Sequence, residues 1–196
     1  DEHKQLRTSL ENDIATTCCG KGYNQPIMLQ GAFGIGKTTT LNYLFHYAWE
    51  VLKVPTFHIL LSDLVEVVKK AALEQGVEKI QNELLAKIIK NVLDDQINKL
   101  KTEDWSTLTN LWFPDFTSMD EDVPLSLDDY LVDFAPVQID ADIDETTKNA
   151  FDKGFTKDVI LDAINSSNKP LLLIDEFESR FTDLKNVVTS SGGGIL

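Results

Sequence analysis

The feature of this 196-residue chain that most constrains its fold is the glycine-rich segment 31–38, which has the pattern G-x-x-x-x-G-K-T. The apolar run 27–30 comes before it, and residues 38–51 after it have a helical pattern. Strand, glycine loop and helix in this order are the context in which such a loop holds phosphate groups. Glycines let the backbone curl so that several N–H groups face one anion, and the helix start adds its positive dipole end. The segment therefore predicts a phosphate-binding loop in an α/β domain.

Two side chains at the end of this loop have the chemistry that nucleotide binding needs. Lys37 can reach the β- and γ-phosphates as a mobile charge, and the hydroxyl of Thr38 can bind Mg²⁺. A glycine-rich turn with a purely structural role is the alternative, but the four fixed positions and both flanks match the functional pattern. The predicted nucleotide-binding residues are Gly31, Ala32, Phe33, Gly34, Ile35, Gly36, Lys37, Thr38 and Thr39.

A second motif is the apolar run 171–174, which ends in the acidic pair Asp175 and Glu176. Sites in open α/β sheets lie at the carboxyl ends of the strands, so a strand here would bring both acids beside the phosphate loop. We expect Asp175 to bind Mg²⁺ together with Thr38, and Glu176 to be the general base that polarises the attacking water. Lys37 and Glu176 are thus the predicted catalytic residues. Acids that merely cap the following helix are the alternative.

The loop 31–38 and the sequence Ile174-Asp175-Glu176 resemble the motifs of P-loop ATPases with a catalytic glutamate beside the Walker B aspartate. The likeness is greatest to the AAA+ branch and to the signal-transducing ATPases. It implies a three-layer αβα core with a parallel sheet, ATP rather than GTP as the nucleotide, and Mg²⁺ as the metal. It also implies self-association through the ATPase domain, and coupling of ATP turnover to remodelling or loading on DNA or a protein. The run Asp-Glu-Phe-Glu and the N-terminal helix also resemble origin-initiator and defence-associated ATPases.

The chain departs from this family in several places. The stretch between Lys37 and Asp175 is longer than one strand and two helices require, so we expect a helical and acidic insertion over 76–150. It would divide the core into 1–75, with the N-terminal helix, and 151–196, with Asp175. We expect a fragment whose sensor, lid and remaining core lie outside the chain. The only arginines, Arg7 and Arg180, are the candidates for an arginine finger, and Arg180 is equally consistent with a surface ion pair.

Apolar periodicity and turn residues predict the remaining secondary structure. Helices are expected over 3–17, 38–51, 64–72, 77–100 and 148–165, and buried strands over 27–30, 56–61 and 171–174.

The acidic residues are concentrated in one segment. The net charge is −14, from 32 acids and 18 bases, and residues 103–146 contain 13 of the acids and no Lys or Arg. This segment is also rich in aromatic residues. It is interpreted either as a solvated insertion or as a docking surface for a basic protein partner. Because the charge does not suit nucleic acid, we expect that any DNA would be bound only through parts outside this chain.

Several other kinds of site and location are disfavoured. No run of about 20 apolar residues and no signal sequence occurs, so we expect a cytoplasmic protein without a membrane partner. Cys18 and Cys19 are neighbours and are expected to be buried thiols. Asp140, Asp142 and Asp144 resemble the start of a calcium loop, but its glycine and final glutamate are missing. His3, His46 and His58 have no ligand-spaced partners in the sequence, so Mg²⁺ is the only metal indicated.

Three functions remain open. The leading prediction is an ATPase module, and the alternative is an ATP-gated switch or scaffold, of a defence or signalling type, that turns over little ATP and recruits a partner through its acidic segment. A small-molecule kinase ranks third, because a water-directing glutamate beside the metal aspartate suits hydrolysis better than transfer.

Overall fold

The computed structural model describes residues 2–20, 26–32, 34–102 and 143–189. Over these residues the fold is α/β and mostly helical, with parallel sheets of two strands each. The predicted α/β class is confirmed. The described elements are α1 (Glu2–Ile14), the π-helical turn η1 (Ala15–Cys19), α2 (Lys37–His46), the π-helical turn η2 (Tyr47–Val51), β1 (Thr56–Leu60), α3 (Leu61–Glu74), β2 (Ile80–Gln81), α4 (Asn82–Lys101), α7 (Glu145–Lys153), α8 (Lys157–Asn165), β3 (Leu171–Asp175), α9 (Phe177–Val187) and β4 (Val188–Thr189).

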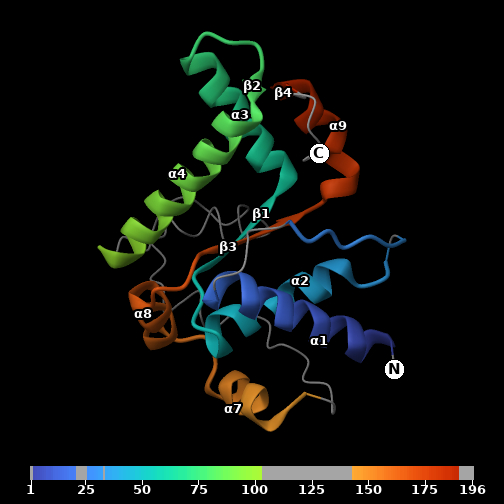
Figure 1. Cartoon of the computed structure of the whole chain (residues 1–196), viewed down its shortest axis with the longest axis vertical. Helices are drawn as coiled ribbons and strands as arrows, with labels where there is room; N and C mark the ends of the chain where they lie inside the picture. Colours follow the sequence, from blue (N-terminus) through green and yellow to red (C-terminus); the bar gives the residue numbers. More distant parts are fainter. Residues whose placement is uncertain (1, 21–25, 33, 103–142, 190–196) are drawn as a thin grey trace, which may run out of the picture.

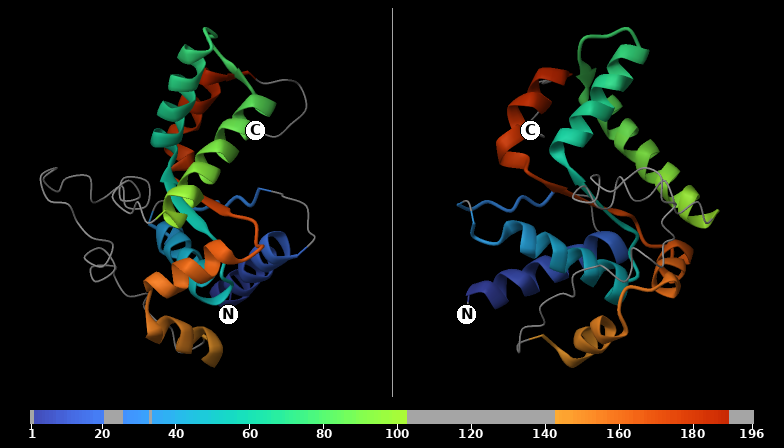
Figure 2. Two further views of the ribbon diagram at one scale, coloured as in Figure 1. Left: turned by 90° about the vertical axis from the view of Figure 1, so that its left-hand side faces the viewer. Right: turned by 180° about the vertical axis from the view of Figure 1, so that it is seen from behind.

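The centre of the molecule is the parallel pair β1 and β3, in a register that runs from Thr56 opposite Leu171 to Leu60 opposite Asp175. Parallel strands end at the same edge of their sheet, so the acidic end of β3 lies beside the end of β1. Helices α3 and α9 lie beyond that end, α4 lies along one face of the pair, and α1, α7 and α8 lie toward the other end (Figures 1 and 2). Helix α2 begins beside Asp175 and runs back toward the start of β1. A second parallel pair, β2 with β4, lies beyond α3 and α9.

The strand predicted over 27–30 is wrong. The segment has no regular secondary structure, and Ile27 and Met28 are 48% and 58% exposed. An apolar run becomes a strand only where a neighbouring strand accepts its backbone hydrogen bonds. In the described part of the chain β3 pairs with β1 alone, and that partner comes from residues 56–60. Of the run itself, Leu29 packs against the core.

The predicted helices are present, with different boundaries. The first, over 3–17, is α1 followed by η1, and the one over 38–51 is α2 followed by η2. Residues 80–81 are a short strand, so α4 begins later than expected. The helix predicted over 148–165 is two helices, because Gly154 between them has a φ of 74°, which no helical residue adopts.

The core is built around Trp49 on η2, whose side chain is fully buried. Its indole Nε1 donates a hydrogen bond to the carbonyl oxygen of Thr56 at 2.8 Å, which ties the end of the α2 segment to the start of β1. Phe45, Phe57 and Phe155 pack around it. A second cluster joins α3 to α9, and a third holds α1 against α2. Among the described helices, none is both long enough and apolar enough to cross a membrane.

Candidate functional site

The glycine loop ends in two left-handed turns that lead into α2. Gly34 has a φ of 79° and Gly36 a φ of 92°. A Cβ at either position would meet no atom within 4 Å, so it is the backbone conformation and not the available space that requires glycine. The N–H of Ile35 donates to the carbonyl oxygen of Ala32 at 3.4 Å, and that of Thr40 donates to Gly36 at 2.9 Å. Gly34 and Gly36 therefore have backbone conformations that favour glycine.

The ammonium group of Lys37 lies over this loop. Its Nζ donates to the carbonyl oxygen of Gly31 at 2.6 Å and to that of Ala32 at 3.2 Å. Both acceptors are neutral, whereas hydrogen bonds from an ammonium to a charged oxygen are about twice as strong. A phosphate group at the loop would therefore compete well for the same donor.

Thr38 and Asp175 are in direct contact. The Oγ1 of Thr38 donates a hydrogen bond to the Oδ2 of Asp175 at 2.9 Å. Thr38 is the second residue of α2, and Asp175 is the last residue of β3. The fold therefore brings the two predicted metal ligands together. Hydroxyl and carboxylate oxygens are the donors that Mg²⁺ prefers, and Mg²⁺ usually takes only one or two protein ligands besides phosphate and water. This pair fits that donor set.

Glu176 begins the turn out of β3 with a left-handed backbone, φ 57° and ψ 23°. Such a conformation costs a residue other than glycine about 1 to 2 kcal/mol. Its N–H donates to Oδ1 of Asp175 at 2.8 Å, so the same turn also orients the neighbouring carboxylate. The side chain of Glu176 is exposed, as a group that acts on a substrate must be. Strained backbone of this kind is often found at functional sites.

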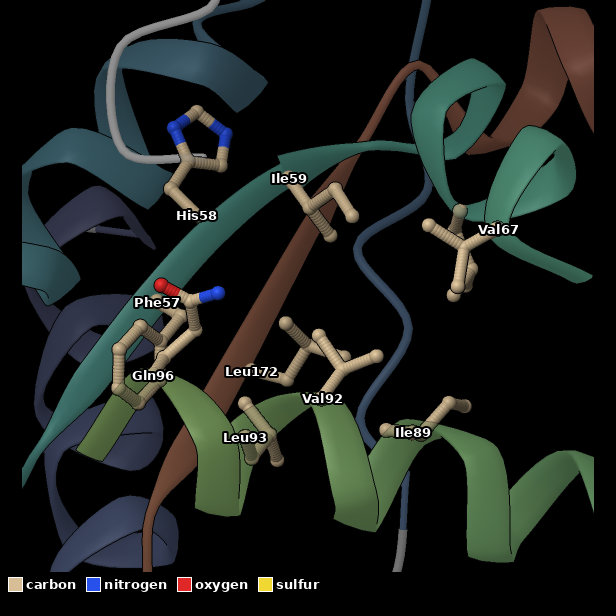
Figure 3. Close-up of a pocket in the computed structure, with 10 residues that line it drawn as sticks. Phe57, His58, Ile59, Val67, Ile89, Val92, Leu93, Gln96 and Leu172 are labelled. Atoms are coloured by element: carbon tan, nitrogen blue, oxygen red, sulfur yellow. The ribbon is translucent and has the colours of Figure 1, made fainter. Parts of the chain in front are cut away.

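The site also contains a residue that the sequence analysis set aside. The Nε2 of His58 lies 4.0 Å from Oδ2 of Asp175, and the two side chains are 13% and 16% exposed. Figure 3 shows the imidazole on the face of β1 opposite to Phe57 and Ile59. Spacing along the chain could not reveal this neighbour, since strand pairing creates it. The available signal was a titratable residue in the middle of an otherwise apolar strand.

Several predicted residues lie elsewhere or outside the described residues. Phe33 and residues 103–142 are outside them, as is the side chain of Arg180 on α9. Arg7 on α1 lies 3.7 Å from Glu11 and 5.6 Å from the ring centre of Tyr43. Thr39 is exposed in the first turn of α2, beside Thr38.

The cysteine expectation is half right. Cys18 and Cys19 are both free thiols, as expected, but only Cys18 is buried, and Cys19 is exposed. Burial raises the pKa of the Cys18 thiol to about 11, with a smaller contribution from Cys19. A thiol that is protonated at neutral pH is a poor nucleophile, so Cys18 is a structural residue.

Asp144, at the end of the calcium-like run, caps a helix. Its Oδ1 accepts from the N–H of Thr147 at 3.0 Å and its Oδ2 accepts from the hydroxyl of Thr147 at 2.7 Å. These hydrogen bonds lower the pKa of the Asp144 carboxyl. Within the described ranges, no group of three or more His, Cys, Asp or Glu side chains could hold a metal ion.

An apolar cavity of about 20 Å³ lies on the other side of β1, between it and helices α3 and α4 (Figure 3). That volume is enough for about one water molecule, so the cavity is not a nucleotide site.

Comparisons of the chain with protein-family models, with curated proteins and with solved structures find no match. The function therefore has to be inferred from the residues themselves.

Proposed function

We propose that this chain is an Mg²⁺-dependent ATP-binding and ATP-hydrolysing module of the P-loop type, similar to AAA+ and signal-transducing ATPases. The observation that carries the proposal is the hydrogen bond from Thr38 to Asp175. A phosphate-loop threonine and an acidic strand end are predicted from separate motifs, and their contact is what a shared metal position requires. A glycine-rich turn with a purely structural role would not require a contact between Thr38 and Asp175.

The proposed division of roles follows from position. The backbone N–H groups of the loop and the ammonium of Lys37 bind the phosphates, because both lie at the start of α2, where the helix dipole favours anions. Thr38 and Asp175 hold the metal, which would neutralise charge on the phosphate oxygens. Glu176 accepts a proton from the attacking water, since its carboxylate is exposed at the end of β3.

The parallel pair β1 and β3, with α2 entering from the loop, supports a P-loop core as the parent fold. A partner for segment 103–146 stays a prediction, because most of that segment lies outside the described residues. Self-association through the ATPase domain also stays a prediction.

The test is equilibrium binding of ATP with Mg²⁺, together with phosphate release, on the full chain. Lys37→Ala should lower the affinity for ATP at least about tenfold, whereas Glu176→Gln should keep the affinity and lower turnover about a hundredfold. The matched controls are Lys69→Ala and Glu66→Gln, because these residues form an exposed ion pair with each other on α3. A wild-type chain that binds no ATP at millimolar Mg²⁺ contradicts the proposal. Binding without turnover would favour the ATP-gated switch.

A further inference from the structure

His58 occupies an unusual position for a titratable residue. It is the central residue of β1, and its side chain is only 13% exposed. The side chains of Phe57 and Ile59, on either side of it, point into the apolar layer that faces α4, and the imidazole points away from them (Figure 3). A polar ring at such a depth costs free energy unless polar groups surround it.

Among the described residues, the carboxylate of Asp175 is a polar group that faces it. Nε2 of His58 lies 4.0 Å from Oδ2, which is the oxygen that accepts the hydrogen bond from Thr38. The other oxygen, Oδ1, accepts from the N–H of Glu176. The carboxylate is therefore contacted from α2, from its own turn and from β1, so His58 provides the contact from the neighbouring strand.

At this distance the two atoms do not form a direct hydrogen bond, and the attraction between the polar ring and the carboxylate is electrostatic. The contact with His58 favours one orientation of Oδ2, the oxygen of Asp175 that accepts the hydrogen bond from Thr38. Replacing a polar partner that orients a metal ligand typically changes the metal affinity by about 10- to 100-fold.

We propose that His58 is a positioning residue for the divalent cation, holding the Asp175 carboxylate in the orientation in which it and Thr38 share the ion. This inference rests on the proposed function, since it assigns the metal to Thr38 and Asp175. It adds a third element, β1, to a site that the sequence motifs place on α2 and β3 alone.

The test compares His58→Met with His58→Gln. The two new side chains have similar length, but only glutamine has a polar end that can keep an electrostatic contact with Oδ2 of Asp175. The measured quantity is the Mg²⁺ concentration that gives half-maximal ATP binding. We expect His58→Met to raise it about tenfold and His58→Gln to stay within about threefold of the wild type.

Two further measurements separate positioning from a structural role. ATP affinity in EDTA should be the same for both variants, because it does not involve the cation. The free energy of unfolding without metal checks that both variants are folded under the assay conditions. If His58→Met does not fold, His58→Phe takes its place, because phenylalanine keeps a ring at this position but has no polar atoms in it. Equal Mg²⁺ requirements in the apolar and glutamine variants overturn the inference.

Measuring Thr38→Ala in the same assay distinguishes a failure of the His58 inference from a failure of the proposed function. If Thr38→Ala raises the Mg²⁺ requirement and the apolar His58 variant does not, the positioning role is wrong and the ATPase site stands. If the wild type shows no Mg²⁺-dependent ATP binding, both are wrong.

Discussion

The hydroxyl of Thr38 and the carboxylate of Asp175 are joined by a 2.9 Å hydrogen bond, although 137 positions separate them in the chain. The contact brings the start of α2 to the end of β3. It unites the two motifs that the sequence contains, and the predictions for the site depend on it.

Thr38→Val should raise the Mg²⁺ requirement of ATP binding about tenfold and leave ATP affinity in EDTA unchanged, because valine keeps the shape and removes the oxygen. Thr40→Val is the matched control, since the Thr40 hydroxyl donates to the carbonyl oxygen of Gly36 within its own helix. Titration of Mg²⁺ at fixed ATP measures both. Equal shifts in the two variants would show that Thr38 is not a metal ligand.

Glu176→Gly should give a more stable protein than Glu176→Ala, by about 1 kcal/mol, because the φ of 57° suits glycine and strains alanine. Both variants should lose turnover, since both lack the carboxylate. Urea denaturation and phosphate release measure the two effects. An alanine variant as stable as the glycine variant would mean that the turn relaxes and stores no strain.

His46→Leu should destabilise the protein by about 3 kcal/mol, because it removes the hydrogen-bond partner of the buried Glu50 carboxyl group. Nδ1 of His46 lies 2.5 Å from Oε1 of Glu50, and the two residues are 6% and 5% exposed. The double variant with Glu50→Leu should lose less than the sum of the single changes. A double-mutant cycle in urea measures the coupling, and additive losses would argue against a linked pair.

Stability should fall as the pH rises from 9.0 toward about 11, in part through Cys18. Its thiol ionises at the ordinary pKa of 9.0 when unfolded and only at about 11 when folded. The contribution is therefore complete below pH 9.0 and is lost progressively as the pH approaches about 11. Cys18→Ala should show a weaker dependence in urea titrations across this range. Tyr43, whose pKa burial also raises, is present in both proteins and cancels in the comparison.

Gln96→Met should stabilise the protein by about 1 kcal/mol, because Oε1 of Gln96 is buried without a hydrogen-bond partner among the described residues. The residue is 5% exposed and borders the apolar cavity beside β1. Gln75→Met, at an exposed position after α3, is the control and should change stability by less than about 0.5 kcal/mol. Calorimetry or urea unfolding checks both, and a destabilised Gln96→Met would mean that the amide has an important polar contact.

Local patterns predicted much of the fold. The loop glycines, the helix that begins at Lys37 and the strands around His58 and Leu173 were expected, since positive φ, helical periodicity and short apolar runs are properties of adjacent residues. The strand over 27–30 failed, because pairing needs a partner that no local pattern specifies. Asp175 and Thr38 were identified from separate motifs, and they were expected near each other because sites in open α/β sheets lie at the carboxyl ends of the strands.

The sequence by itself determined the chemistry that this protein has available: a loop that only glycine can turn, an ammonium beside it, and two carboxylates at a strand end. Tertiary structure alone decided which groups meet. The parallel register of β1 with β3 brought His58 to Asp175, and the packing of α2 brought Thr38 to the same oxygen. The physical reason is that side-chain type is a property of each residue, whereas proximity across the chain depends on backbone hydrogen bonds and core packing formed by distant segments.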